Sequence, residues 1–278
     1  MNSIIYSEKI KKDLSAKIYS DLHYREGDDL TFFSNSIDNC LISLPDYIFI
    51  LGDLVDDSRC SIKELKELLE LLNRLSKISK VIFTLGNHEG HTKGKGKWND
   101  LYNQELISEL RNLGIIVLEN EYYVDENIFV YGTKFKGEYY IEKEPIIEFK
   151  KSMSNVDFSN SNKFNILCEH SPKHTFNSDV ISTINGLKEV DLVLAGHYHN
   201  GCIPNCLSKI IPGNFGLISP YKELFPKNAR GEKQITENTY GIISPPIRMF
   251  STDSKLAKIN DILYPPSEND ILIKRKIL

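Results

Sequence analysis

The sequence has no hydrophobic run long enough to cross a lipid bilayer. Its longest apolar runs, such as Tyr47–Leu51 and Leu192–Ala195, have five and four residues, whereas a transmembrane helix needs about 20. The first 21 residues carry charge where a secretory signal peptide would need an apolar segment. These absences predict a soluble chain without a transmembrane segment that stays in the cytoplasm.

Cysteine is also scarce. The five cysteines form an odd set without a Cys-x-x-Cys pair; they are Cys40, Cys60, Cys168, Cys202 and Cys206. Such a set predicts reduced thiols in the cytoplasm rather than a disulfide framework. Cys202 and Cys206 lie near His197 and His199, so they are either plain thiols or half of a zinc site that has no second cysteine pair.

Neither charge sign dominates the composition. The 278 residues include 34 Lys and Arg against 38 Asp and Glu, a net charge of −4. This balance argues against a generally basic surface, so no stable nucleic-acid partner is expected. Only 16 Gly and 11 Pro, with 41% hydrophobic residues, exclude collagen-like and disordered chains. We find no linker, and residues 1–278 are therefore predicted to form a single domain of undetermined oligomeric state.

Short apolar runs alternate with helical patterns. Seven runs rich in Ile, Val, Phe or Tyr predict buried strands: 16–20, Tyr47–Leu51, 81–85, 115–118, 128–131, 165–168 and Leu192–Ala195. Leu and Ile recur every three or four residues over 62–78, which predicts an amphipathic helix with Ser61 as its N-cap. A second helix is predicted over 101–113, ended by Gly114. The alternation indicates a layered α/β fold.

Two segments lack either pattern, namely 90–98 and the proline-containing stretch 201–231. Irregular segments of this length in a compact domain usually serve a site. We therefore expect a loop-rich C-terminal part, about 201–278, to cover the site.

Polar motifs follow five of the predicted strands. They are Asp21-Leu22-His23, the run GDLVDD at 52–57, Gly86-Asn87-His88-Glu89, Glu169-His170 and Gly196-His197-Tyr198-His199. Each motif alone has an ordinary explanation, such as a buried Asp–His hydrogen bond or turn chemistry. In open α/β sheets, however, ligands bind beyond the carboxyl ends of the strands. The five motifs are therefore expected to converge on one site.

The side chains in these motifs suit a pair of divalent cations. Such a pair needs carboxylate, imidazole and amide donors, with one carboxylate that bridges both ions. Seven side chains qualify: Asp21, His23, Asp53, Asn87, His170, His197 and His199. Asp53 is the natural bridge because its motif is central in the order. Since the motifs contain no thiolate, they predict two divalent transition-metal ions per chain, which can be Mn, Fe, Zn, Co or Ni.

In order and spacing, the motifs DLH, GDLVDD, GNHE, the separate His170 and GHYH resemble those of the calcineurin-like metallophosphoesterase superfamily. The resemblance implies a four-layer αββα sandwich of two mixed β-sheets flanked by helices. It assigns one metal to Asp21, His23, Asp53 and His199, and the other to Asp53, Asn87, His170 and His197. His88 would be a catalytic residue that faces the scissile phosphate and is held by Asp56.

The activity implied by this resemblance is hydrolysis of a phosphodiester, a diphosphate or a small phosphomonoester. A hydroxide that bridges the two metals would attack phosphorus, so no covalent intermediate is expected. Asn87 would neutralise charge on the phosphate oxygens, and His88 would stabilise or protonate the leaving group. The alternatives are a catalytically silent scaffold of the same fold, which would tend to lose ligands or His88, and a nuclease.

Departures from the superfamily pattern narrow the expected substrates. Phosphoprotein phosphatases continue the second motif with Arg-Gly, whereas Asp57-Ser58 stands here, which disfavours that class. The C-terminal segments resemble bacterial predicted phosphohydrolases, although Asn200 and Cys202 replace the Gly and Gln that are frequent there.

Three basic residues are candidates for substrate binding. Arg248 lies between apolar neighbours, where a charge is rarely placed without a role. Lys93 and Lys95 lie in the Gly-rich segment after GNHE, for which a solvated flexible loop is the alternative.

Overall fold

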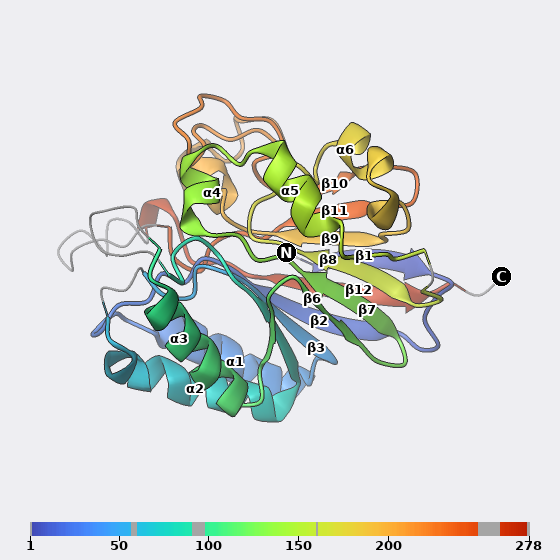
Figure 1. Cartoon of the computed structure of the whole chain (residues 1–278). Coiled ribbons are helices and arrows are strands. Elements are labelled where there is room, and N and C mark those ends of the chain that lie inside the picture. The colour runs from blue at the N-terminus through green and yellow to red at the C-terminus, as the bar shows by residue number, and fades with distance from the viewer. Residues whose placement is uncertain (1, 57–59, 91–97, 160, 250–261, 277–278) are drawn as a thin grey trace.

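Two mixed β-sheets lie face to face in the computed structural model, and helices cover the outer face of each sheet (Figure 1). The structure describes residues 2–56, 60–90, 98–159, 161–249 and 262–276. Within these ranges each sheet has six strands. The order of layers, helices then two sheets then helices, confirms the predicted αββα sandwich.

The first sheet has the strand order β1-β12-β2-β3-β4-β5. Its strands are β1 Asn2–Ser7, β2 Leu14–Tyr19, β3 Tyr47–Leu51, β4 Lys80–Thr84, β5 Ile116–Leu118 and β12 Asn269–Arg275. Neighbours are parallel except β12 and β2, which are antiparallel. Parallel strands covered on both faces are expected to be apolar throughout, and every residue of β3 is buried.

The second sheet has the order β10-β11-β9-β8-β7-β6. Its strands are β6 Glu121–Val124, β7 Ile128–Gly132, β8 Phe164–Cys168, β9 Leu192–Ala195, β10 Gly231–Gln234 and β11 Tyr240–Ile243. The central strands β7, β8, β9 and β11 are parallel, and the edge strands β6 and β10 are antiparallel to their neighbours. The parallel centre of each sheet can therefore present several carboxyl ends on one side.

Helices form the two outer layers. The first sheet is covered by α1 Thr31–Ser43, α2 Lys66–Ile78 and α3 Asp100–Asn112, and the second by α4 Gly137–Ile141, α5 Ile146–Met153 and α6 Ser178–Thr183. Short 3₁₀ helices are Ile62–Leu65, Asn185–Leu187, His199–Cys202 and Asn205–Leu207.

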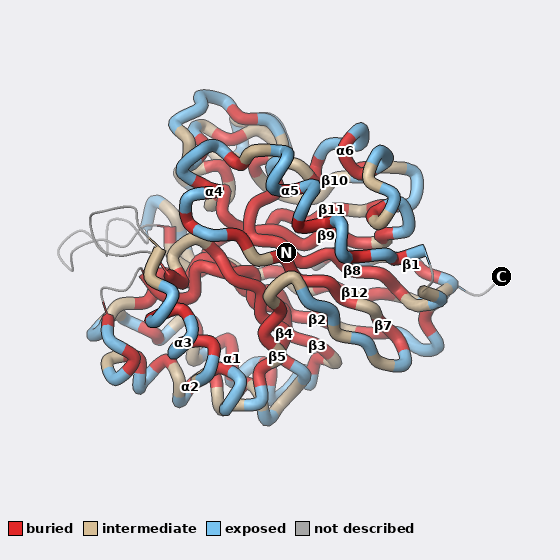
Figure 2. Tube along the Cα trace, in the orientation of Figure 1, coloured by how far each residue is buried: buried red, intermediate tan, exposed pale blue. Residues whose placement is uncertain are grey.

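One apolar cluster fills each space between layers, represented by Leu68, Phe49 and Leu167. Figure 2 accordingly shows buried chain concentrated in the sheets and exposed chain on the outer sides of the helices.

The elements predicted from the sequence are confirmed. Each of the predicted strands is present with ends within two residues of those expected. Ser61 and Glu64 form a capping box ahead of the helical segment that ends at Ile78. Gly114 follows α3 with a φ of 81°, a left-handed conformation that glycine adopts at little cost.

The C-terminal part has more regular structure than the sequence analysis expected. Residues 201–230 are largely irregular, but β10 and β11 follow, and β12 crosses to the first sheet and inserts between β1 and β2. No helix in the described part of the chain is long and apolar enough to cross a membrane.

Candidate dinuclear metal centre

Each polar motif begins where a strand ends. Strands β2, β3 and β4 run parallel in the first sheet, and β8 and β9 run parallel in the second. Their motifs meet at one edge of the stack, where donor atoms from both sheets lie within 4.8 Å of one another. Segments far apart in the sequence thus form one site.

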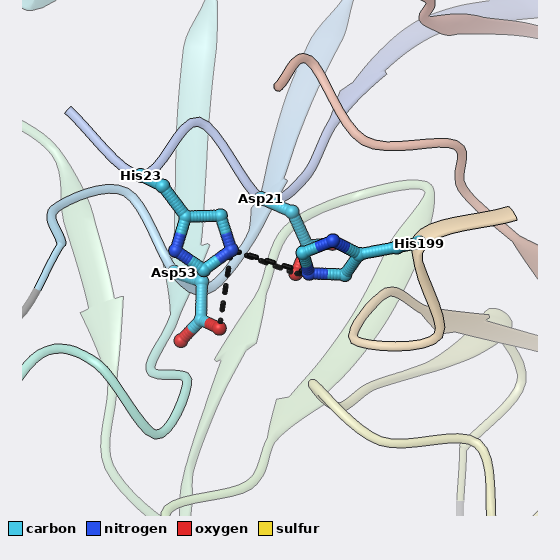
Figure 3. A group of neighbouring side chains, drawn as sticks. All are labelled: Asp21, His23, Asp53 and His199. Atoms are coloured by element: carbon cyan, nitrogen blue, oxygen red, sulfur yellow. Dashed lines mark hydrogen bonds and ion pairs between the residues drawn. The ribbon is translucent and has the colours of Figure 1, made fainter. Parts of the chain in front are cut away.

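The first donor group combines Asp21, His23, Asp53 and His199 (Figure 3). The His23 Nε2 atom lies 3.2 Å from His199 Nε2 and 3.7 Å from Asp53 Oδ2. Oδ1 of Asp21 lies 3.2 Å from His199 Nε2. Two carboxylates and two imidazoles therefore converge on a space small enough for one cation.

The second donor group combines Asp53, His170 and His197. The Asp53 Oδ2 atom lies 3.1 Å from His170 Nε2, which in turn lies 3.1 Å from His197 Nδ1. Asp53 belongs to both groups, the position that a bridging carboxylate must occupy. The Oδ1 atom of Asn87 is buried without a hydrogen-bond partner among the described residues.

These side chains fit two divalent cations. A buried amide oxygen without a partner costs free energy, and an ion next to Asn87 would remove this cost. Imidazole, carboxylate and amide donors without thiolate suit Mn, Fe, Zn, Co and Ni, and the geometry does not select one of them.

Backbone carbonyls orient two of the imidazoles. The Nδ1 atom of His170 lies 2.7 Å from the Leu51 carbonyl oxygen, and Nδ1 of His199 lies 2.6 Å from that of Met249. Because a carbonyl only accepts, each Nδ1 carries the proton. When such a ring is neutral, its Nε2 atom is left with the lone pair that faces the site.

The ligand segments are held in unusual backbone conformations. Five of the predicted ligands have a positive φ between 47° and 65°: Asp21, His23, Asp53, His197 and His199. Such conformations cost about 1–3 kcal/mol each and persist where the surroundings enforce them. Gly86 allows the close packing here, because a Cβ at this position would lie 2.3 Å from Asp53 Oδ1.

His88 lies beside the two donor groups. Its Nδ1 atom is 3.3 Å from Asp56 Oδ1, and its backbone N–H donates to Asp53 Oδ1 over 2.8 Å. Asp56 in turn accepts a hydrogen bond from Nε of Arg25. The pairing of His88 with Asp56 agrees with the prediction. Arg25 was not predicted, and its one signal in the sequence is its place two residues after His23.

Glu89 is a second residue to which the sequence analysis gave no role. Its carboxylate accepts hydrogen bonds from the backbone N–H groups of Asp53 at 3.0 Å, Leu54 at 2.7 Å and Gly86 at 2.6 Å. Burial, together with the nearby Asp53 charge, raises the pKa of Glu89 to about 7. Glu89 thus ties the loop after β3 to the loop after β4.

Electrostatics favour the cation-binding forms of Asp53 and His23. They do not favour that of His170, where burial lowers the pKa but the nearby Asp53 charge outweighs it and raises the pKa to about 9. Burial by itself raises the pKa of Asp53, but His170 and His88 outweigh it and hold the pKa well below its usual value. Burial lowers the pKa of His23 to about 3, and His88 adds to the lowering. At neutral pH Asp53 is an anion and His23 a neutral imidazole.

A cavity of about 400 Å³ opens onto the donor groups. Its lining consists of His23, Asp53, Asp56, Asn87, His88, His197, His199, Cys202, Pro220 and Met249. A phosphate group that enters it would meet the donor side chains and His88, with Cys202, Pro220 and Met249 as the less polar part of the wall.

The predicted substrate contact Arg248 is not in this lining. The Nη1 atom of Arg248 forms an ion pair with Asp28, and its Nη2 atom donates to the Asp29 carbonyl oxygen. Lys93 and Lys95 lie outside the described residues. A role for these three residues stays a prediction.

Cys202 and Cys206 differ in their surroundings. Cys202 lines the cavity, and Cys206 is exposed. Burial raises the pKa of Cys202 to about 11, so the side chain is a thiol at neutral pH. Within the described ranges neither cysteine belongs to a group of three or more metal-ligating side chains, which favours plain thiols over a zinc half-site.

Comparison with known proteins finds a similar sequence and similar solved structures. An uncharacterised metallophosphoesterase of Campylobacter jejuni is 27% identical over 194 residues, which are 70% of this chain and 46% of the relative. The match thus spans about half the length of that relative. Among solved structures, a dimetal phosphatase from Danio rerio has a TM-score of 0.46 at 10% identity and covers 84% of this chain and 87% of its own. A Thermus thermophilus protein has a TM-score of 0.46 at 11% identity, with 84% and 89% covered.

The family model for calcineurin-like phosphoesterases matches residues 15–201. This range is more than half of the chain and contains every residue of the two donor groups together with Asn87, His88 and Asp56. The chain therefore belongs to the calcineurin-like phosphoesterase family.

Proposed function

We propose that this protein is a metal-dependent phosphohydrolase whose site holds two divalent transition-metal ions. The observation that carries the proposal is the sharing of Asp53 by two donor groups. One ion would be held by Asp21, His23, Asp53 and His199, and the other by Asp53, Asn87, His170 and His197. Two ions placed side by side are the arrangement that many phosphate-cleaving enzymes use.

When bound, the two ions supply a deprotonated nucleophile and neutralise charge on the phosphate oxygens. The chain itself positions the other groups. Asn87 lines the cavity, where its side chain can bind a phosphate oxygen or an ion. Asp56 forms an ion pair with Nδ1 of His88. The Nε2 atom of His88 is then the group that donates a proton to the leaving oxygen. Arg25 holds Asp56 and so acts on His88 indirectly.

The size and lining of the cavity support the proposed substrate classes. About 400 Å³ accommodates a phosphodiester, a diphosphate or a small phosphomonoester. The less polar wall formed by Cys202, Pro220 and Met249 suits the organic part of such a substrate. Arg248, Lys93 and Lys95 are proposed to contact the substrate.

The alternatives differ in what they require of the site. A scaffold that binds protein partners has no need for the buried donors and His88, whereas this site keeps all of them. A nuclease would use the same donors but needs contacts along a nucleic-acid backbone, and its binding would weaken steeply with salt. We therefore favour hydrolysis of a small substrate.

The decisive experiment measures metal content and hydrolysis together. Protein purified without chelator is expected to hold about two transition-metal ions per chain and, after Mn²⁺ is added, to hydrolyse bis(4-nitrophenyl) phosphate. Less than about one ion per chain combined with no hydrolysis would refute the proposal. Assays with phosphomonoesters, nucleotide diphosphates and single-stranded DNA at two salt concentrations then separate the substrate classes.

A further inference from the structure

The ring nitrogen of His197 that points away from the donor groups contacts a side chain rather than a backbone carbonyl. His170 and His199 each use Nδ1 to contact a backbone carbonyl. His197 is turned the other way, with Nδ1 toward His170 and Nε2 3.0 Å from the hydroxyl of Tyr221. A side chain from the 201–230 segment thus does for His197 what the main chain does for the other two.

Tyr221 is itself held by an acidic residue. Its hydroxyl donates a hydrogen bond to Oε1 of Glu144, and this oxygen lies 3.9 Å from His197 Nε2. The Glu144 side chain is fully buried. A carboxylate buried this deeply is retained only where hydrogen bonds or charges compensate its desolvation. The hydrogen bond from Tyr221 therefore offsets part of the free-energy cost of burying Glu144.

The backbone at Glu144 has an unusual conformation. Lys143 and Glu144 both have a left-handed conformation, with φ values of 63° and 56°. The Glu144 N–H donates to the Tyr139 carbonyl oxygen over 2.8 Å, which ends α4 and turns the side chain inward. Two successive non-glycine residues in this region are costly, a pattern found where a precise position matters.

The direction of the hydrogen bonds selects one form of His197. A carboxylate only accepts hydrogen bonds, so the Tyr221 hydroxyl donates its hydrogen to Glu144. The hydroxyl oxygen can then only accept a hydrogen bond from His197. Nε2 of His197 then carries the ring proton, and Nδ1 keeps its lone pair on the side of the second donor group.

The same contact fixes part of the cavity wall. Tyr221 lies in a tight turn in which the Lys222 N–H donates to the Ser219 carbonyl oxygen over 2.9 Å. Residues Ile218 and Leu224 pair across this turn, and Pro220 at its tip lines the cavity. The Tyr221 hydroxyl is thus a tether between this turn and the donor groups.

We propose that Tyr221 and Glu144 are positioning residues: they orient His197 so that Nδ1 binds the second metal ion, and they tether the turn 218–224 as a wall of the substrate cavity. This inference rests on the proposed metal centre. Outer hydrogen-bond partners of ligating histidines commonly change metal affinity by about 10- to 100-fold.

The test compares Tyr221→Phe with the matched control Tyr131→Phe. Both remove one hydroxyl from a mostly buried ring, but Tyr131 donates to the Ser152 carbonyl oxygen at 2.9 Å and belongs neither to a donor group nor to the cavity lining. Co²⁺ is titrated into chelator-treated protein, and both the affinity and the visible absorption of each bound ion are followed. We expect Tyr221→Phe to lower the affinity for one of the two Co²⁺ ions by about 10- to 100-fold and to change the absorption spectrum of that ion. Tyr131→Phe should leave both the affinities and the spectra unchanged.

A second variant keeps the test decisive if Tyr221→Phe does not fold. Glu144→Gln retains the size of the side chain but removes its charge, so the hydrogen bond from Tyr221 weakens. We expect this variant to lose Co²⁺ affinity at the same ion to a smaller extent. Circular dichroism of the metal-free proteins establishes that each variant is folded.

The possible failures are distinguishable. If the unaltered protein binds no Co²⁺, the proposed function fails and this inference falls with it. If the unaltered protein binds two ions and folded Tyr221→Phe or Glu144→Gln binds them with the same affinities and spectra, this inference alone is overturned.

Discussion

At the scale of single residues, the Asp53 carboxylate lies next to groups from three of the polar motifs. Its Oδ1 atom accepts from the His88 backbone, while Oδ2 lies 3.1 Å from His170 and 3.7 Å from His23. One carboxylate therefore contacts the motifs that follow β2, β4 and β8. Loss of its charge acts on both donor groups at once.

Replacement of Asp53 by Asn is expected to remove most bound metal. The amide retains the size of the side chain but supplies no anionic bridge, so metal content should fall from two ions to less than about one. Hydrolysis should decrease by about 100-fold or more, as for loss of a main charge-stabilising group. Elemental analysis and phosphodiester assays measure both, and full metal content in folded Asp53→Asn would contradict the bridging role.

His88→Asn is expected to separate binding from catalysis. Removal of a general acid costs about 100- to 10,000-fold in turnover, whereas the metal ligands remain. Steady-state kinetics should therefore show a lower kcat with metal content equal to that of the unaltered protein. Loss of both metals in this variant would show that His88 has a structural role at the centre instead.

At the scale of secondary structure, one turn connects the two sheets. Asp125, between β6 and β7, accepts from the backbone N–H of Asn127 at 2.9 Å and of Ile128 at 3.1 Å. It also accepts from the Tyr47 hydroxyl at 2.8 Å and from Lys80 at 3.0 Å, which belong to β3 and β4. This carboxylate therefore joins a turn of the second sheet to strands of the first.

Stability is expected to depend on the charge of Asp125. Burial raises its pKa, but the Asn127 and Ile128 N–H groups outweigh this and hold the pKa below its usual value. A lowered pKa stabilises the fold above the unfolded pKa of about 3.9, and this contribution is lost as pH falls through the folded value.

The measurement is chemical unfolding of Asp125→Asn at several pH values. At pH 7 the variant should be less stable by about 1.5–3 kcal/mol, the range for hydrogen bonds to a charged group. The difference should shrink as pH falls below about 4. Asp38→Asn, which removes an exposed ion pair with Arg74, is the control and should change stability by less than about 1 kcal/mol. An equally large loss at pH 3 and pH 7 would contradict the role of the charge.

The buried strands could be predicted from the sequence, whereas several other elements could not. Strands such as β3 are continuous apolar runs, because they are covered on both faces. Edge strands lack this signal: β6 is mostly exposed, and β10 has the polar sequence GEKQ. The N-cap of helix α1 is Leu30, which makes no side-chain cap hydrogen bond, so the usual N-cap residue type is missing at its start.

The candidate site shows the same division. Its donors directly follow strands, so local patterns together with strand order were enough to predict that they converge. Arg25, Glu144 and Tyr221 act on other side chains instead, and they reach the site through the packing of separate segments. Glu144 comes from the end of a short helix and Tyr221 from an irregular stretch, where no repeating pattern exists.

At the scale of the whole molecule, the donors come from both sheets. Asp21, His23, Asp53 and Asn87 follow strands of the first sheet, and His170, His197 and His199 follow strands of the second. Ions bound between them would join the two halves of the sandwich. Metal binding should therefore stabilise the whole fold.

Removal of metal is expected to lower the melting temperature. An ion present at 100 times its dissociation constant stabilises the folded state by about 2.7 kcal/mol. Thermal unfolding should thus occur at lower temperature after chelator treatment and recover when Mn²⁺ is added back. Asp53→Asn is the control and should show little change on either treatment. Equal melting temperatures with and without metal would contradict a site that joins the sheets.

The insertion of β12 between β1 and β2 has a consequence for synthesis on the ribosome. Strand β2, which leads directly into Asp21 and His23, pairs with β3 on one side and with β12 on the other. Until residues 269–275 have emerged, that second side of β2 exposes unpaired backbone groups, a surface prone to aggregation. Assembly of the metal centre is thus coupled to translation of a segment that contributes no ligand to it.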